Sequence, residues 1–298
     1  MNTHKQEFDH KREAILHLLN EARDFYSGKD RNEEAKTFQS IADQLMAGEF
    51  SIVVVGEFSA GKSTFLNALM GEKILPSFTS ETTATVNFLK SRDKAPENEP
   101  GIVYYSNGQK QILERVDFET VQKYVSTNSE IQVAQDVEHL DLFLDSKFLN
   151  EGVMLVDSPG LNGTKAHHRE ITERQIERSS ASIFMFRANA PGSKSDFDFL
   201  RELKQKVNTI IFVLNRIDEI RQSEGESVED VVEKLRQSYK EQFPEDNVMP
   251  EIWPIAAYPA LVARSKQRLD YLGINNPTEE QKKKWLADSR LEAFEDRL

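Results

Sequence analysis

The 298-residue chain contains no cysteine, so disulfide bonds, thiolate zinc sites and thiol catalysis are excluded. It also lacks a long apolar run: stretches such as residues 210–214 are far shorter than the roughly 20 residues of a membrane-spanning helix. The first residues have no apolar core followed by a small-residue cleavage site, so they do not match a secretory signal. We therefore expect a cytoplasmic protein.

Positive charge is in deficit, with 38 basic against 50 acidic residues and a formal net charge of −12. A field of this sign repels nucleic acids and anionic lipid on average, and we expect no nucleic-acid partner. Apolar residues make up 38% and charged residues 30%, which is typical of a folded, water-soluble chain. The length suggests one large domain or two ordinary ones.

The first fifty residues differ from the rest because their apolar residues recur at helical spacing. Two such stripes, separated near Ser27–Gly28, predict two amphipathic helices. The apolar positions are Phe8, Ile15, Leu18, Leu19, Ala22, Phe25, Ala35, Phe38, Ile41, Ala42, Leu45 and Met46.

From Ser51 onward, short β-branched runs alternate with helical stretches. Expected strands are 52–55, 85–89, 140–144, 153–156, 183–186, 210–214 and 253–256, with a hairpin around Asn107–Gly108. The alternating segment 140–144 is expected at a sheet edge. The pattern predicts an α/β fold, a mostly parallel central sheet with helices on both faces, whose ligands bind at the carboxyl ends of the strands.

A phosphate-binding pattern follows the first of these strands and opens a helix. Its glycines let backbone N–H groups point at phosphate oxygens, and the helix adds its N-terminal dipole. Lys62 can reach the β- and γ-phosphates, and the Ser63 hydroxyl can bind Mg²⁺. The candidate nucleotide-binding residues here are Gly56, Glu57, Phe58, Ser59, Ala60, Gly61, Lys62, Ser63 and Thr64.

Two further motifs follow strands. Asp157-Ser158-Pro159-Gly160 offers a carboxylate for Mg²⁺ through water and an N–H for the γ-phosphate, although alone it is equally typical of a turn. Asn215-Arg216-Ile217-Asp218 offers a carboxylate that can accept guanine N1–H and the exocyclic amine together. Alone, this motif is also typical of capping residues where a helix begins. The order of the three motifs, each at a strand end, favours guanine-nucleotide binding.

This order resembles the GTPase class of P-loop proteins and, more narrowly, the dynamin superfamily, the bacterial dynamin-like proteins in particular. The resemblance depends on Ser59 inside the P-loop, Leu75-Pro76 followed by Thr82-Thr83, the Asp-Ser-Pro-Gly motif and the two preceding helices. It covers about residues 51–257. It implies a P-loop GTPase that hydrolyses GTP to GDP and phosphate with Mg²⁺.

The resemblance also implies catalytic and metal-binding roles for individual residues of this chain. Ser59, Lys62, Thr83 and Gly160 would be catalytic, and Ser63, Thr83 and Asp157 would hold the metal; Thr82 is the adjacent alternative to Thr83. Ala256 would lie in the weak last guanine-binding motif. Three departures stand out: Phe58 replaces a glutamine, Arg216 a lysine, and Leu161 stands where Ras-like proteins orient water with glutamine.

In dynamins, a monovalent cation, K⁺ or Na⁺, supplies positive charge when two GTPase domains pair. The resemblance therefore implies a homodimer across the nucleotide face, with residues 189–195 contacting the partner; a helix capped by Ser193 is an equally good interpretation of that segment. Hydrolysis would be slow in the monomer and faster in the nucleotide-driven dimer.

The expected division is an N-terminal helical neck segment (1–50), a GTPase domain (51–276) and a C-terminal helix (277–298) at the start of a stalk. We expect a truncated chain, or else a protein without a stalk. Membrane remodelling, with peripheral membrane association of the full-length protein, would then depend on regions absent here. Three alternatives remain: a regulatory switch GTPase acting through an effector, a nucleotide-gated assembly module, and an ATP-dependent P-loop protein.

Overall fold

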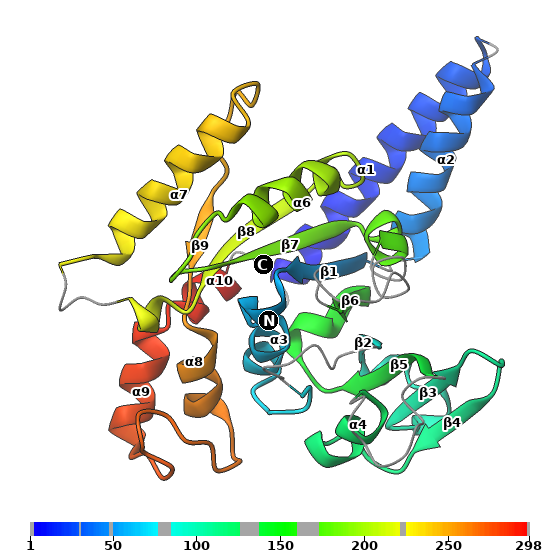
Figure 1. Cartoon of the computed structure of the whole chain (residues 1–298). Coiled ribbons are helices and arrows are strands. Elements are labelled where there is room, and N and C mark those ends of the chain that lie inside the picture. Colours follow the sequence, from blue (N-terminus) through cyan, green and yellow to red (C-terminus); the bar gives the residue numbers. More distant parts are fainter. Residues whose placement is uncertain are drawn as a thin grey trace. The chain divides into compact units, whose positions relative to one another are not determined.

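The computed structural model describes residues 3–29, 31–47, 50–76, 85–125, 137–159, 173–220 and 225–296. The chain divides into two compact units, Met1–Phe50 with Glu151–Val153, and Ser51–Asn150 with Met154–Leu298. The first is a helical hairpin and the second an α/β domain (Figure 1). In the part of the chain so described, no helix combines the length and apolar character needed to cross a membrane.

The hairpin consists of α1 (Thr3–Ser27) and α2 (Asn32–Ala47), which confirms the two predicted helices. Near the turn, the rings of Tyr26 and Phe38 stack with centroids 5.4 Å apart. Near the open end, Arg12 Nε donates to Leu45 O at 3.1 Å. The end of α1 therefore pairs with the start of α2, so the helices are antiparallel.

A mixed sheet forms the centre of the α/β domain and has the order β4-β3-β5-β2-β6-β1-β7-β8-β9 within the described residues. Its strands are β1 (Phe50–Gly56), β2 (Val86–Ser91), β3 (Gly101–Tyr105), β4 (Lys110–Leu113), β5 (Val137–Leu144), β6 (Val153–Asp157), β7 (Ala181–Arg187), β8 (Ile210–Asn215) and β9 (Ile252–Pro254). Pairing is parallel along β1-β7-β8-β9 and between β2 and β5, and antiparallel for β2-β6, β3-β5 and β3-β4.

Helices cover both faces of this sheet. They are α3 (Lys62–Met70), α4 (Phe118–Val125), α6 (Lys194–Lys204), α7 (Val228–Gln242), α8 (Ala257–Arg264), α9 (Glu279–Asp288) and α10 (Leu291–Glu295). Around β7–β9, α6 and α7 lie on one face and α3, α8 and α10 on the other (Figure 1). The expected α/β sheet with helices on both faces is confirmed.

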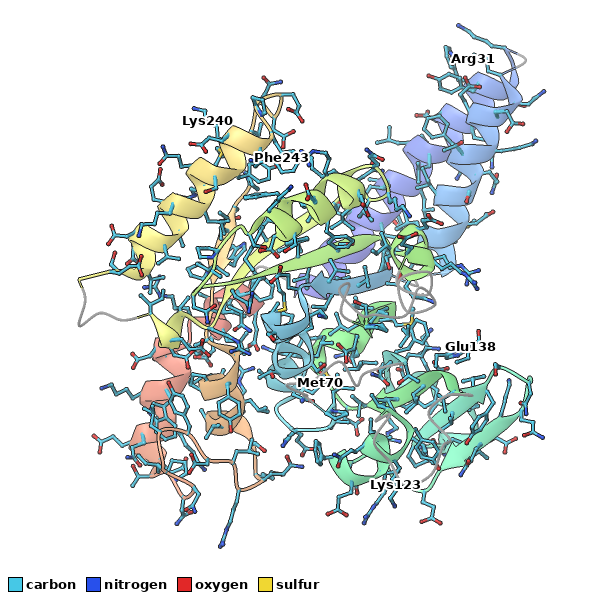
Figure 2. The ribbon with its side chains drawn as sticks, in the orientation of Figure 1. Arg31, Met70, Lys123, Glu138, Lys240 and Phe243 are labelled. Carbon is cyan, nitrogen blue, oxygen red and sulfur yellow. The ribbon has the colours of Figure 1, made fainter. Side chains whose placement is uncertain are left out.

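The side chains of alternate strand residues build the core under α6 and α7. Phe184 and Phe186 of β7 have centroids 4.7 Å apart, and Phe186 lies 5.9 Å from Phe212 of β8. Phe243, labelled in Figure 2, closes one end of this cluster with its ring 6.1 Å from Phe197. This buried core packs β7 and β8 against α6 and α7, which positions the residues at the carboxyl ends of the two strands.

The prediction that residues 140–144 form an edge strand is wrong. They belong to β5, which lies between β2 and β3, and the edge on this side is β4. Alternation suggested the edge position, but Asp141 inside this strand has a buried carboxylate that accepts a hydrogen bond from Lys90 Nζ of β2 at 2.8 Å. Because β5 pairs with β2 on one side and with β3 on the other, it has no free edge.

The single C-terminal helix expected over residues 277–298 is interrupted at Arg290, whose φ of 55° separates α9 from α10. Phe294 of α10 is buried, with its ring 5.6 Å from Phe65 and 5.9 Å from Trp253. The proposed division at residue 277 stays a prediction, while α10 packs within the same compact unit as the sheet.

Candidate nucleotide-binding site

Four strand ends bring the three predicted motifs and Arg187 to one end of the sheet. β6, β1, β7 and β8 are neighbours in that order and end at Asp157, Gly56, Arg187 and Asn215. Carboxyl ends of strands in such sheets form the crevice in which ligands bind. Residues from distant parts of the chain therefore face a shared site.

The loop between β1 and α3 needs glycine at two positions. Gly56 has φ of 144°, and a Cβ there would lie 2.5 Å from Met185 O of β7. Gly61 has φ of 89°, and a Cβ there would lie 2.4 Å from Asn215 Nδ2. Any side chain would push this loop away from its neighbours. The glycines of the motif thus bring the loop close to β7 and β8.

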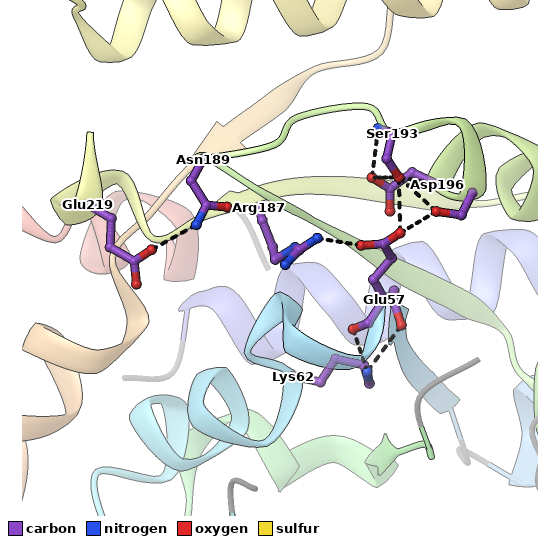
Figure 3. A network of polar contacts seen from close by, with 9 residues as sticks. Glu57, Lys62, Arg187, Asn189, Ser193, Asp196 and Glu219 are labelled. Atoms are coloured by element: carbon purple, nitrogen blue, oxygen red, sulfur yellow. Dashed lines mark hydrogen bonds and ion pairs between the residues drawn. The ribbon is translucent and has the colours of Figure 1, made fainter. Parts of the chain in front are cut away.

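Lys62, at the start of α3, folds back over the loop. Its Nζ donates to Gly56 O at 3.1 Å and to Glu57 O at 3.0 Å (Figure 3). Only 5% of the residue is exposed, and this burial lowers the Lys62 pKa to about 8 in spite of the nearby Asp157 and Glu57 carboxylates. Among the described residues, its hydrogen-bond partners are these two carbonyl groups, so the buried cation gains a strong partner when an anion enters the loop.

Asp157, at the end of β6, reaches the other side of the same loop. Ser63 Oγ donates to Asp157 Oδ2 at 3.0 Å, and Asn87 Nδ2 lies 3.4 Å from the same oxygen. Burial raises the pKa of Asp157 to about 6, although Lys62 and the hydrogen bonds from Ser63 and Asn87 oppose the shift. The structure thus brings together Ser63 and Asp157, two residues that were predicted to hold the metal.

The Ser63–Asp157 pair fits a divalent cation. Asp157 Oδ1 is buried and accepts no hydrogen bond from any described residue. An unpartnered buried carboxylate oxygen is costly, and a hydroxyl and a carboxylate are oxygen ligands of the kind that Mg²⁺ prefers. The donor set thus matches the metal that the motif implies.

Asn215 joins the loop to the start of α8. Its Nδ2 donates to Ala60 O at 2.8 Å, and its Oδ1 accepts from Ala257 N at 3.0 Å. Because both ends of the carboxamide are used, Asn215 holds three segments in fixed positions. The second half of the guanine motif begins from this anchor.

Asp218 lies one turn further, in a short 3₁₀ helix spanning Ile217–Glu219. The residue is exposed, and partial desolvation of its carboxylate is the largest cause of its raised pKa, with Glu219 adding to the shift and a hydrogen bond from Tyr271 opposing it. Arg216 adopts a φ of 67° and its Nη1 lies 3.0 Å from Glu219 Oε1. The Arg216 guanidinium is therefore engaged in a surface ion pair here.

Some predicted positions fall outside the described residues: Thr82, Thr83, Gly160 and Leu161, together with the side chain of Phe58. Ser59 and Ala60 lie in the 3₁₀ turn Phe58–Ala60 of the loop, and Thr64 lies in α3. Ala256 precedes α8, and its N–H donates to Ser289 O at 2.9 Å. The roles of these residues remain predictions.

Sequence reasoning missed a polar network around Glu57, the first variable residue of the loop. Its carboxylate accepts hydrogen bonds from Arg187 Nη2 at 2.7 Å, from Ser193 Oγ at 3.0 Å and from Ser195 Oγ (Figure 3). Burial would raise the Glu57 pKa, but these three donors outweigh it and lower the pKa. An acidic residue inside a phosphate-binding loop was the signal that could have pointed to a nearby cation.

The same network contains the cap of α6. Ser193 Oγ accepts from Asp196 N at 3.1 Å, and Asp196 Oδ2 accepts from Ser193 N at 3.1 Å, which makes a reciprocal capping box. The interpretation of Ser193 as a helix cap is therefore confirmed. Contact of residues 189–195 with a second copy stays a prediction.

The sheet order, the glycine-bound loop with its buried lysine, and the Ser63–Asp157 pair define an α/β protein of the P-loop class, with the GTPase type of fold. The sequence profile of the Dynamin family matches residues 52–218. The chain belongs to the dynamin family, as its motifs suggested.

Curated relatives agree with this assignment. The chain is 32% identical over 214 residues to a bacterial dynamin-like protein from Nostoc punctiforme, covering 68% of this chain and 30% of the relative. It is 24% identical over 256 residues to an uncharacterized protein from Caldicellulosiruptor, covering 86% of this chain and 60% of the relative. The chain thus spans less than two thirds of the length of either relative.

Solved structures share the fold. A structure of an oligomerised bacterial dynamin pair matches with a TM-score of 0.60 and 18% identity, covering 96% of this chain and 50% of that one. The LeoA bacterial dynamin GTPase from ETEC matches with a TM-score of 0.51 and 16% identity, covering 98% and 43%.

Proposed function

We propose that this chain is the GTPase portion of a dynamin-like protein and hydrolyses GTP to GDP and phosphate with Mg²⁺. The observation that carries the proposal is the convergence of Lys62, the Ser63–Asp157 pair and Asn215 on one glycine-rich loop. A structural loop would not need a buried lysine and an unpartnered buried carboxylate oxygen beside each other.

In this proposal the phosphates lie in the loop, with Lys62 moving from the carbonyl oxygens to the β- and γ-phosphates. Ser63, Asp157 and Thr83 would hold Mg²⁺, which supplies positive charge against the charge that develops on the phosphate oxygens. Ser59, Thr83 and the Gly160 N–H would orient the attacking water and stabilise the transferring phosphoryl group. Asp218 would select guanine, because adenine lacks the pair of donors that its carboxylate accepts.

Charge compensation during the reaction is typically worth about 10³–10⁵ in rate. We propose that pairing of two copies across the nucleotide face, with K⁺ or Na⁺ held in the dimer, provides it here. One solved relative is described as an oligomerised bacterial dynamin pair for long-range sensing and tethering of membranes, which supports pairing. In a longer protein, the same cycle would drive membrane remodelling from the cytoplasmic side.

The test measures GTP turnover per protomer against protein concentration, in K⁺, Na⁺ and a larger organic cation. We expect turnover to rise with concentration and to need K⁺ or Na⁺. Light scattering with GDP, a GTP analogue and GDP–aluminium fluoride should show a dimer with the last of these. Flat turnover and a monomer in every state would instead favour a regulatory switch that acts through an effector.

ATP use is tested separately. Asp218→Asn should reduce the preference for GDP over ADP. A substitution of Asn215 would not be a clean test, because this side chain also supports the loop. If the wild-type protein binds ADP as tightly as GDP, guanine selection is wrong and the ATP-dependent alternative gains support.

A further inference from the structure

The segment between α8 and α9 turns back toward the end of β8. Tyr271 and Ile274 form a two-residue antiparallel bridge, with N–O distances of 3.1 and 3.0 Å. Between them, Gly273 has φ of 77° and its N–H donates to Asp270 Oδ1 at 3.2 Å. This tight turn fixes the backbone at Tyr271.

The Tyr271 ring is held from two sides. It makes an edge contact with Trp285 of α9 at 5.0 Å and with Tyr258 of α8 at 6.1 Å. Aromatic pairs in this geometry restrict both side-chain torsions of a tyrosine. The hydroxyl is therefore placed by packing, and it donates to Asp218 Oδ2 at 3.3 Å.

Asp218 and Tyr271 face an open space rather than solid core. Both line a cavity of about 710 Å³, to which Ala256, Trp285 and Asp288 also contribute. A second bond ties the same C-terminal segment to this region, because Ala256 N donates to Ser289 O at 2.9 Å. Two residues expected to contact the base are thus each bound by a residue beyond position 270.

A carboxylate has about four lone-pair positions, and guanine uses two of them through N1–H and the exocyclic amine. A tyrosine donor on one oxygen therefore leaves room for the base. It also favours the charged form of Asp218, whereas partial desolvation of the carboxylate works in the opposite direction. Both effects of this hydrogen bond assist guanine recognition.

We infer that Tyr271 is a positioning residue for guanine selection, holding the Asp218 carboxylate in the orientation that accepts the two guanine donors; the inference rests on the proposed role of Asp218. Tyr271 acts through Asp218 and does not touch the phosphates. The C-terminal segment is then part of the base site, and Trp285 supports it by fixing the Tyr271 ring.

The test uses Tyr271→Phe, which keeps the ring and removes the hydroxyl. We expect the Kd for GDP to rise about three- to tenfold, since the lost donor served a charged group at the long end of hydrogen-bond distance. Because inosine lacks the exocyclic amine, the ratio of the Kd for IDP to that for GDP should fall. A matched control is Tyr105→Phe, whose hydroxyl donates to Gln111 in the distant hairpin and which should leave both values unchanged.

A double-mutant cycle separates positioning from general destabilisation. In the Asp218→Asn background, Tyr271→Phe should produce no further loss of GDP affinity or of the IDP-to-GDP ratio. Unchanged or tighter GDP binding by Tyr271→Phe alone, or an equal loss in both backgrounds, overturns the inference while leaving the role of Asp218 intact. If Asp218→Asn itself keeps the full guanine preference, both the role of Asp218 and the inference are wrong.

Discussion

Arg187 Nη2 lies 2.7 Å from Glu57 Oε2, although the two residues are 130 positions apart in the chain. Glu57 belongs to the loop expected to bind phosphates, where a carboxylate opposes anion binding, and Arg187 ends β7 beside it. The pair therefore sets the local charge at the loop.

Neutralising Glu57 and neutralising Arg187 should shift nucleotide affinity in opposite directions. Glu57→Gln removes a negative charge and should lower the Kd for GDP about two- to fivefold, whereas Arg187→Gln should raise it by a similar factor. Isothermal titration at low and moderate salt measures both. The double variant should return near the wild-type value, and shifts of the same sign in both single variants would contradict the electrostatic explanation.

Asp196 should make stability depend on pH in an unusual direction. Burial, and secondarily the nearby Glu57, raise its pKa to about 6 against 3.8 in an unfolded chain, in spite of the Ser193 hydrogen bonds and Arg187. As pH rises from about 4 to about 6, the unfolded state loses this proton before the folded state does, so stability falls over that interval and is level above it.

Asp196→Asn removes this titration, so the variant lacks the loss of stability that the wild type shows as pH rises from about 4 to about 6. Over that interval, the unfolding free energy of the variant relative to that of the wild type should therefore rise by about 2 to 3 kcal/mol. Urea denaturation at pH 4, 5, 6 and 7 measures it. A constant difference at all four values would show that Asp196 titrates normally in the folded state.

Gly61 should be less tolerant of a side chain than a glycine of similar backbone conformation elsewhere. Gly61→Ala adds a Cβ 2.4 Å from Asn215 Nδ2 at φ of 89°, so the carboxamide must move from Ala60 O. We expect the free energy of unfolding to fall by about 3 kcal/mol or more and GDP binding to be lost.

The matched control is Gly108→Ala in the exposed hairpin, where φ is 83° but nothing lies within 4 Å of the added carbon. The free energy of unfolding of this variant should fall by only about 1 to 2 kcal/mol, because of backbone strain, and GDP binding should be kept. Equal losses in the two variants would show that the contact with Asn215 is unimportant.

The dependence of nucleotide affinity on Mg²⁺ should require Ser63 and Asp157. Ser63→Ala and Asp157→Asn should each remove most of the gain in GTP-analogue affinity that Mg²⁺ provides, measured as the ratio of Kd values in EDTA and in Mg²⁺. Ser158→Ala is the control, because its hydroxyl donates to Val54 O at 2.7 Å and serves the fold. An unchanged ratio in Ser63→Ala would remove this residue from the metal site.

Local signals were sufficient for most elements. The hairpin at Asn107–Gly108, the helix that begins at Lys62 and the cap at Ser193 depend on residues a few positions apart, and each occurs as expected. The position of β5 did not follow from its own pattern, because a neighbouring strand on each side and the Lys90 partner of Asp141 come from distant sequence.

The candidate site divides in the same way. The sequence alone determined that a phosphate-binding loop, Asp157 and Asn215 follow strands, since backbone freedom at glycine and hydrophobic periodicity act over a few residues. Only the tertiary structure decided that Arg187 neutralises Glu57 and that Tyr271 binds Asp218. Such pairs depend on which strand ends become neighbours and on how a returning segment packs, and both are set by burial of the shared core rather than by any local pattern.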